Sequence, residues 1–198
     1  MPCQIHSGFL NREQQMDLLA RIREILHSAP LYTPQMPRTG KPFSVQMSNC
    51  GALGWVSDRR GYRYQETHPQ SGKPWPDMPP ELVELWDALT GYEAPPEACL
   101  VNYYHAGARL GLHVDKDEMD MEAPILSISL GDTALFRMGG PTRKSPTCSV
   151  RLGSGDVLIM AQDARRAYHG VDRIYPGSSN LLEEGGRFNL TLRRVNLP

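Results

Sequence analysis

The sequence predicts an α+β fold in which helices pack outside a β-sandwich of the jelly-roll type. From Ala98 onward, short β-type runs alternate with turns, a spacing typical of a sandwich or barrel rather than of βαβ units. Before Ala98, two segments repeat apolar residues at helical spacing. The chain has 198 residues, 40% of them hydrophobic, which is enough for one domain with a sizeable core.

The first helix is expected to begin after Asn11, a residue type that caps helix N-termini, with Gln14 three residues later. Pro30 is expected to end it. Between these two points the apolar residues recur at helical spacing: Leu18, Leu19, Ile22, Ile25 and Leu26. A Pro/Gly-rich stretch and a short strand within residues 43–49 should follow.

Residues 67–80 are predicted to form a long loop. A second helix is predicted over residues 80–89, with proline at its start. The later part of the chain then supplies the strands of the sandwich. They are predicted within residues 98–104, 111–115, 123–131, 133–140, 148–153, 156–161, 167–175 and 187–195.

Composition narrows the class of protein. The net charge is −1, so a polyanion partner would need a local basic patch. The four cysteines are scattered without a C-x-x-C pair, which argues against a zinc ribbon and a disulfide scaffold and favours a reducing cytoplasm. We expect no signal peptide and no membrane span, because no apolar stretch approaches the roughly 18–20 residues that a span needs.

The segment "LHVD" carries the first chemical signal. Residues i and i+2 of a strand point to the same side, which places His113 and Asp115 on one face. His169, in "AYHGVD", is a third candidate from a later strand. Two histidines and one carboxylate, with three positions left open, form the facial triad of non-haem Fe(II) oxygenases. By itself, an H-x-D pair is more often a charged strand end than a metal site.

The final strand carries the second signal, a polar row opposite an apolar one. Such a row normally faces water, but two arginines in it also match a dicarboxylate, because each guanidinium is a planar fork of donors. Asn102 and Tyr104 share one side of an earlier strand in the same way. The row consists of Arg187, Asn189, Thr191 and Arg193.

These motifs, taken in order, resemble the AlkB family of Fe(II)- and 2-oxoglutarate-dependent dioxygenases. The likeness rests on "NYY", "HVD", "YHG" and "RFNLTLR", together with "SNCGALGW", "GYRY" and "KPWP". It runs from about residue 43 to residue 195, and the first 40 or so residues show no comparable match. Several motifs in family order are far more specific than any one of them.

The resemblance implies one dioxygenase domain over residues 1–198, built on a double-stranded β-helix (jelly roll). Within it we expect an N-terminal helix and connecting loop over residues 1–42. A nucleotide-recognition lid and helix should occupy residues 43–95, and the catalytic core residues 96–198.

The resemblance also implies the cofactors and their contacts. Fe(II) would be held by the catalytic residues His113, Asp115 and His169, with 2-oxoglutarate and O₂ as co-substrates. Arg187 would pair with the distal carboxylate of 2-oxoglutarate and Arg193 with the end nearer the metal. The full set of expected 2-oxoglutarate contacts is Asn102, Tyr104, Arg187, Asn189 and Arg193.

The implied activity is repair of DNA or RNA by oxidative demethylation. N-alkyl lesions of the 1-methyladenine and 3-methylcytosine type would be removed, with release of formaldehyde and succinate. The expected partner is alkylated DNA, preferably single-stranded, with RNA as an alternative; we expect a cytoplasmic monomer that binds no membrane. The residues expected to contact the substrate are Met47, Trp55, Tyr62, Asp117, Glu118 and Arg143.

Physical arguments support part of this set. A base must leave the duplex to be oxidised, and aromatic side chains suit an extruded base. Asp117, two residues after Asp115, would meet the cationic base if the strand continues. Lys116 and Asp120 are expected to face water. The arginines of "GWVSDRRGYRY" offer a local basic patch.

Two alternatives stay open. One is the same chemistry on a methylated protein lysine or a small molecule; Trp55, the arginine-rich loop and Asp117 favour nucleic acid over both. The other is a catalytically silent jelly-roll module with a structural metal such as zinc. The complete metal and 2-oxoglutarate contact sets favour the enzyme.

Overall fold

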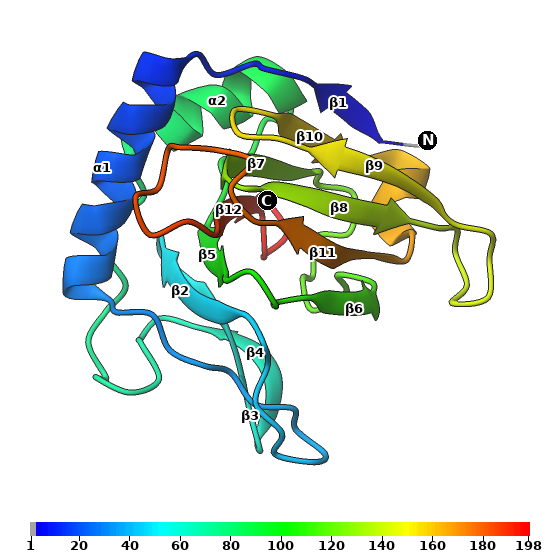
Figure 1. Ribbon diagram of the computed structural model, residues 1–198. Helices are drawn as coiled ribbons and strands as arrows, with labels where there is room; N and C mark the ends of the chain where they lie inside the picture. The colour runs from blue at the N-terminus through cyan, green and yellow to red at the C-terminus, as the bar shows by residue number, and fades with distance from the viewer. Residues whose placement is uncertain (1–2) are drawn as a thin grey trace.

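Two antiparallel β-sheets face each other in the computed structural model, which describes residues 3–198 (Figure 1). The six-stranded sheet has the order β1 (Gln4–His6), β10 (Val157–Met160), β7 (Ile125–Gly131), β12 (Arg187–Arg193), β5 (Ala98–Tyr104) and β2 (Gln46–Cys50). The four-stranded sheet has the order β6 (Leu110–His113), β11 (His169–Tyr175), β8 (Thr133–Met138) and β9 (Cys148–Leu152). All eight strands predicted after residue 97 are present, and the sandwich confirms the predicted fold class.

Two helices cover the outer face of the six-stranded sheet, as predicted (Figure 1). In α1 (Arg12–Ser28), the Asn11 side chain accepts from the Gln14 backbone while the Gln14 side chain accepts from the Asn11 backbone. In α2 (Pro80–Thr90), proline occupies the first turn and Gly91 ends the helix with a φ of 61°. The buried residues of both helices pack on β5, β7, β10 and β12.

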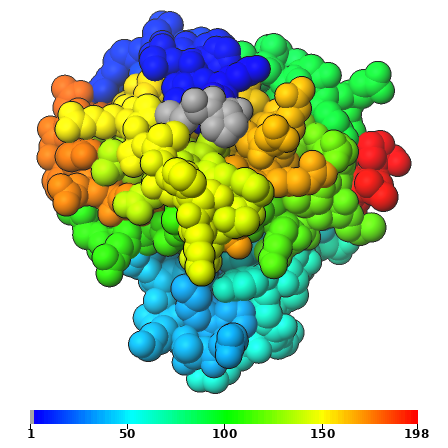
Figure 2. All heavy atoms as spheres, turned by 90° about the vertical axis from the view of Figure 1, so that its right-hand side faces the viewer, coloured from blue at the N-terminus to red at the C-terminus, as the bar shows by residue number. Residues whose placement is uncertain are grey.

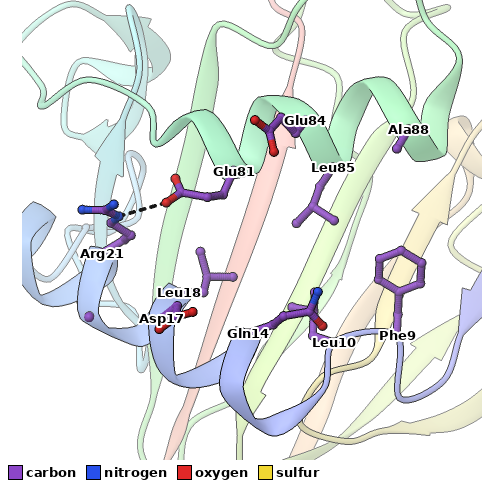
Figure 3. Close-up of a pocket in the computed structure, with 11 residues that line it drawn as sticks. Phe9, Leu10, Gln14, Asp17, Leu18, Arg21, Glu81, Glu84, Leu85 and Ala88 are labelled. Atoms are coloured by element: carbon purple, nitrogen blue, oxygen red, sulfur yellow. Dashed lines mark hydrogen bonds and ion pairs between the residues drawn. The ribbon is translucent and has the colours of Figure 1, made fainter.

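A groove of about 590 Å³ separates these helices on the outside of the molecule (Figure 3). Leu18 and Leu85 line it, and the Arg21 Nε–Glu81 Oε1 ion pair, at 3.1 Å, lies at its edge. The six-stranded sheet stands between this groove and the interior of the sandwich. The groove is therefore separate from the site predicted by the sequence motifs.

β12 lies between β5 and β7, so both of its edges are paired within the sheet. Its apolar residues Phe188, Leu190 and Leu192 face the helices. Because side chains alternate along a strand, its polar row points into the space between the two sheets. The sequence left open whether this row faces water or the interior. The structure supports an interior position, since all four polar residues are buried.

A separate two-stranded hairpin, β3 (Gly54–Asp58) and β4 (Gly61–Gln65), projects from one end of the sandwich (Figures 1 and 2). Neither this hairpin nor β1 was predicted, because each strand is only three to five residues long and mixes polar with apolar residues. Among residues 3–198, no helix is long and apolar enough to cross a membrane.

Candidate metal centre and substrate pocket

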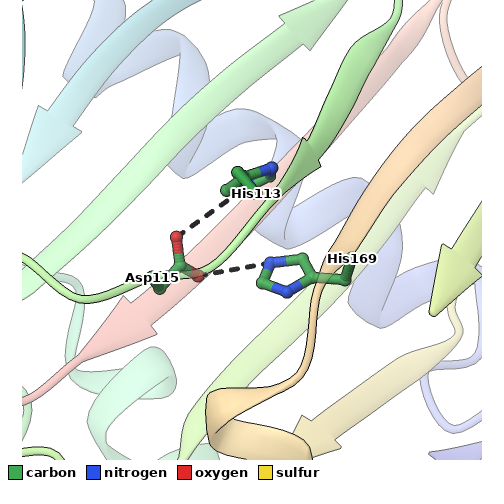
Figure 4. Close-up of side chains that lie close together, drawn as sticks. All are labelled: His113, Asp115 and His169. Atoms are coloured by element: carbon green, nitrogen blue, oxygen red, sulfur yellow. Dashed lines mark ion pairs between the residues drawn. The ribbon is translucent and has the colours of Figure 1, made fainter. Parts of the chain in front are cut away.

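Three predicted ligands meet between the sheets (Figure 4). His113 ends β6, and its pairing partner in the register is His169, which begins β11. The Nε2 atoms of His113 and His169 lie 3.6 Å and 3.4 Å from the two carboxylate oxygens of Asp115. One ligand atom from each residue falls within 4.8 Å of the others, a spacing that suits a single metal ion.

The hydrogen bonds of the histidines leave their Nε2 atoms available. His113 Nδ1 lies 2.9 Å from the Gly111 carbonyl, and His169 Nδ1 lies 3.1 Å from the Ala167 carbonyl. A carbonyl only accepts, so each neutral imidazole carries its proton on Nδ1 and keeps the Nε2 lone pair free. Backbone carbonyls are common partners of metal-binding histidines, and they orient the ring.

The charges also suit a metal. Burial lowers the pKa of His113, which favours the neutral imidazole that a metal needs. Burial acts to raise the pKa of Asp115, but Arg193 and His169 outweigh it and hold that pKa well below the ordinary value. At neutral pH the site therefore presents a neutral His113 and an ionised carboxylate.

Asp115 reaches the histidines by a route that the sequence did not predict. β6 ends at His113, so the expectation that Asp115 lies on the same strand face is wrong. The strand stops because pairing with β11 ends at the His113–His169 position. The Asp115 carboxylate is held instead by Arg193, whose Nη2 lies 3.0 Å from Oδ2.

Arg187 is a buried cation without an acidic partner in the described part of the chain. Its side chain donates to Ser129 Oγ at 3.0 Å, while Nε and Nη1 have no hydrogen-bond partner. Its guanidinium lies 5.3 Å from the centre of the Tyr104 ring, and burial lowers its pKa. A buried guanidinium with two unused donors fits a carboxylate supplied by a bound acid.

The other residues predicted to contact 2-oxoglutarate differ in how many of their hydrogen-bonding atoms already have a partner in the protein. Arg193 Nε and Asn102 Oδ1 are buried without a partner, and both residues reach the same pocket. Tyr104 is buried, and that burial raises the pKa of its hydroxyl, while the charge of nearby Arg187 acts in the opposite direction. Asn189 is engaged within the sheet, because its Nδ2 donates to Ser127 Oγ at 2.8 Å and to the Ile128 carbonyl at 2.9 Å.

A pocket of about 450 Å³ opens beside the three ligands. His113 and Asp115 form part of its wall, so any molecule in it meets the candidate metal centre. The hairpin and the loop between β8 and β9 both border it. The predicted substrate residues that line it are Met47, Trp55, Tyr62, Asp117 and Arg143.

Aromatic rings form the hairpin side of this pocket. Trp55 stacks on Tyr62, with ring centres 5.5 Å apart and planes inclined by 18°. Trp55 Nε1 donates to Asp117 Oδ2 at 2.8 Å, which links the hairpin to the segment after Asp115. On the opposite side, the Arg143 guanidinium lies 5.2 Å from the centre of the Tyr168 ring.

Two acidic residues of the same segment lie elsewhere than expected. Glu118 is not brought to the pocket: its buried carboxylate accepts from Tyr64 Oη at 2.5 Å, Arg193 Nη1 at 2.7 Å and Arg165 Nη2 at 3.0 Å. The expectation that Asp120 faces water is wrong, because it is buried and accepts from Tyr92 Oη at 2.7 Å. Lys116 is exposed as expected, and it borders the pocket.

The basic patch of the hairpin is partly neutralised. Arg63 and Arg60 both pair with Asp58, at 2.9 Å and 3.3 Å. Sequence reasoning also missed Arg165, which donates to the Asp115 carbonyl at 2.6 Å. In "QDARRAYHG" nothing distinguishes Arg165 from its neighbour Arg166, although only Arg165 is buried.

Comparison with known proteins agrees with this geometry. The 2OG-Fe(II) oxygenase superfamily model matches residues 2–193. An α-ketoglutarate-dependent dioxygenase AlkB homolog of Caulobacter vibrioides is 55% identical over 188 residues, covering 95% of this chain and 85% of that protein. The α-ketoglutarate-dependent dioxygenase AlkB of Escherichia coli is 40% identical over 182 residues, covering 90% and 83%.

A solved structure gives the same result for the fold. The structure of OsALKBH1 aligns with a TM-score of 0.79 and 32% identity, covering 98% of both chains. The match of residues 2–193 also corrects the expectation that the first 40 residues lie outside the likeness. That segment contains α1, whose helix-forming residues carry no site motif, so inspection of motifs did not detect it.

Proposed function

Because the chain belongs to the AlkB family within the 2OG-Fe(II) oxygenase superfamily, we propose that it removes N-alkyl lesions from single-stranded DNA. As a member of this family, the protein is an Fe(II)- and 2-oxoglutarate-dependent dioxygenase that acts in oxidative demethylation repair of nucleic acids. The lesions proposed are of the 1-methyladenine and 3-methylcytosine type, with RNA as a second substrate. The hydroxylated methyl group would leave as formaldehyde.

The residues present fit the cofactors. His113, Asp115 and His169 would hold Fe(II), and the two unused donors of buried Arg187 would hold the distal carboxylate of 2-oxoglutarate. Arg193 and Asn102, which line the pocket beside the three ligands, each have a further unused polar atom. When bound, iron and 2-oxoglutarate supply the oxidation of the methyl group by O₂, with succinate and CO₂ as co-products.

One observation carries the choice of substrate: a carboxylate and an aromatic pair share a pocket with the metal ligands. A base alkylated at its pairing nitrogen is flat and cationic, and it keeps an exocyclic amine. Trp55 and Tyr62 offer a stacking surface, and Asp117 offers an acceptor and a compensating charge. A methylated lysine also binds aromatic faces through its charge, but it has no flat ring to stack on Trp55 and Tyr62 and no exocyclic amine on a ring for Asp117.

Other observations support a nucleic acid and a single strand. Two relatives, each 30% identical, are a nucleic acid dioxygenase of Mus musculus and a tRNA demethylase of Schizosaccharomyces pombe. Exposed Lys116 and Arg143 border the pocket, where phosphates would run. A single strand presents its base without the unpairing cost of a few kcal/mol. We propose further that the protein acts as a monomer in the cytoplasm.

The test is formaldehyde release from matched DNA and RNA oligomers that carry one 1-methyladenine or 3-methylcytosine each. Unmethylated oligomers and a trimethyl-lysine peptide serve as controls. We expect release from the lesion-bearing strands alone, with DNA the better substrate. Turnover of the peptide without turnover of either lesion would overturn the proposal.

A matched pair of variants tests the pocket assignment. Asp117→Asn should raise KM for the 3-methylcytosine oligomer. KM for 2-oxoglutarate, measured by succinate formation, should not change. Asp87→Asn, an exposed acid on α2, should behave like the parent. Equal KM values for all three proteins would exclude Asp117 from substrate binding.

A further inference from the structure

The segment that carries Asp115 has no strand to hold it. β6 ends at His113 and β7 begins at Ile125, so residues 114–124 lie outside the sheets. A metal ligand must nevertheless be held in one orientation for the site to bind its ion tightly.

Arg165 supplies contacts along the whole of this segment. Its guanidinium donates to the Asp115 carbonyl at 2.6 Å, to Glu118 Oε2 at 3.0 Å and to the Ala123 carbonyl at 3.1 Å. Three different nitrogens make these three bonds, and the side chain is only 1% exposed. The start, middle and end of the segment are therefore tied to one planar group.

Arg165 also belongs to the approach to His169. It lies in a short 3₁₀ helix, Gln162–Arg166, just before β11 begins at His169. Gln162, at its start, has a φ of 52°, a left-handed conformation that non-glycine residues seldom adopt and that surrounding contacts must maintain. One side chain thus connects the two segments that present Asp115 and His169.

Glu118 links Arg165 to Arg193. It accepts from Arg165 and from Arg193, and Arg193 in turn contacts the Asp115 carboxylate. Two arginines face two carboxylates in a buried cluster, so each charge has an opposite partner. Tyr64, on the hairpin, donates to the same Glu118.

We propose that Arg165 is a positioning residue for the metal centre: through the Asp115 carbonyl and Glu118 it sets the Asp115 carboxylate against the two histidines. The inference rests on the proposed function of those three residues as metal ligands. Because the bonds use three nitrogens in a fixed plane, the shape of the guanidinium matters as well as its charge. Lysine, with one ammonium, cannot reach all three acceptors.

The experiment is an anaerobic titration of the full-length protein with Fe(II) in the presence of 2-oxoglutarate. The visible charge-transfer absorption of the complex gives the apparent Kd for Fe(II) and its maximum. For Arg165→Lys we expect that Kd to rise about 10- to 100-fold, the usual effect of losing a partner that orients a ligand. The absorption maximum should shift as well.

Arg166→Lys is the matched control, since Arg166 is the next residue, is 52% exposed and pairs with Glu122 at the surface. It should keep the Kd and the maximum of the parent. Glu118→Gln, which keeps the side chain's size, should weaken Fe(II) binding in the same direction as Arg165→Lys. Melting curves confirm that each variant is folded at the titration temperature.

The outcomes separate two failures. If Arg165→Lys and Glu118→Gln melt lower but bind Fe(II) as the parent does, their role is structural only and the inference is overturned, while the proposed function stands. If the parent shows neither the absorption band nor formaldehyde release, the proposed function and the inference fail together.

Discussion

Two buried arginines on β12 lie in opposite electrostatic surroundings. Arg193 contacts two carboxylates, those of Asp115 and Glu118. Arg187 has a hydroxyl and the face of a tyrosine ring, but no acid in the described part of the chain. A cation that is desolvated and unpaired costs stability unless a ligand completes it, which supports our proposal that Arg187 binds the anionic co-substrate.

Arg187→Met should therefore separate binding from stability. We expect KM for 2-oxoglutarate to rise about 10- to 100-fold, because a charge-assisted hydrogen bond contributes about 1.5–3 kcal/mol. The melting temperature without 2-oxoglutarate should stay equal or rise, since an unpaired buried charge is removed. Succinate assays and thermal melts measure the two effects, with exposed Arg173→Met as control. An unchanged KM would contradict the assignment.

The metal ligands give a second prediction at this scale. His113→Ala and Asp115→Ala should each abolish succinate production, because each removes a ligand atom that the remaining residues do not replace. Lys116→Ala, which changes the exposed residue directly after Asp115, should keep most of the succinate production. Comparable activity in all three variants would refute the site.

At the scale of elements, two side chains of the hairpin β3–β4 contact the segment that follows Asp115. Trp55 donates to Asp117, and Tyr64 donates to buried Glu118. The hairpin thus touches both the pocket wall and the network behind the metal ligands. Its aromatic face should govern how tightly an extruded base is held.

Trp55→Ala should raise KM for a 3-methylcytosine oligomer about tenfold or more, since stacking on an aromatic ring contributes about 1–3 kcal/mol per base. KM for 2-oxoglutarate should not change, because Arg187 lies on another element. Steady-state assays that vary each substrate in turn separate the two constants. A parallel rise in both would show that the variant disturbs the core rather than the pocket.

One carboxylate accepts three hydrogen bonds from the chain after β12. Glu97 accepts from the backbone of Val195 at 2.9 Å and of Asn196 at 2.8 Å, and from the Asn196 side chain at 2.9 Å. The Val195 carbonyl in turn accepts from the backbone of Met119, in the segment after Asp115. Glu97 therefore stabilises the C-terminal segment and, through it, the metal-ligand segment.

Glu97→Gln should lower the free energy of unfolding by about 1–2 kcal/mol at pH 7. Burial acts to raise the pKa of Glu97, but its bonds to Asn196 and Val195 lower it below the ordinary 4.5. The carboxylate's contribution is thus present above pH 4.5 and is lost as the pH falls below that value.

Denaturant unfolding of parent and Glu97→Gln at pH 7 and pH 3.5 tests this prediction. The difference between the two proteins should shrink at the lower pH. Glu93→Gln, an exposed glutamate nearby in sequence, should match the parent at both. A difference that does not depend on pH would contradict the assigned charge effect.

For the whole molecule, the net charge of −1 means that attraction to a polyanion depends on where charges lie. The acids of α2 lie on the outer face, whereas Lys116 and Arg143 border the pocket. A nucleic acid should therefore bind at the end of the sandwich that carries the hairpin, away from the helices.

Salt dependence measures that local attraction. For a single-stranded oligomer, each neutralised phosphate adds about −0.7 to the slope of log K against log salt concentration. Arg143→Gln should reduce the steepness of the slope by about 0.7, while Arg23→Gln on α1 should leave it unchanged. Fluorescence anisotropy at several salt concentrations gives the slopes. Equal slopes for Arg143→Gln and the parent would place the phosphates elsewhere.

The sequence by itself determined the features that depend on local periodicity. The capping pair of Asn11 and Gln14, the α2 helix and the eight later strands follow from spacing and turn residues. The same alternation placed Arg187 and Arg193 on one face of a strand. The order of short motifs was enough to indicate the family and the three metal ligands.

Only the tertiary structure decided the features that depend on distant contacts. Asp115 lies beyond the end of its strand, Glu118 belongs to a buried ion cluster rather than the pocket, and Arg165 is buried whereas Arg166 is exposed. Side-chain partners that are 47 to 75 residues apart make these differences. Sequence periodicity predicts which face of a strand or helix a residue occupies. The side chain that it contacts on that face depends on how the two sheets pack against each other.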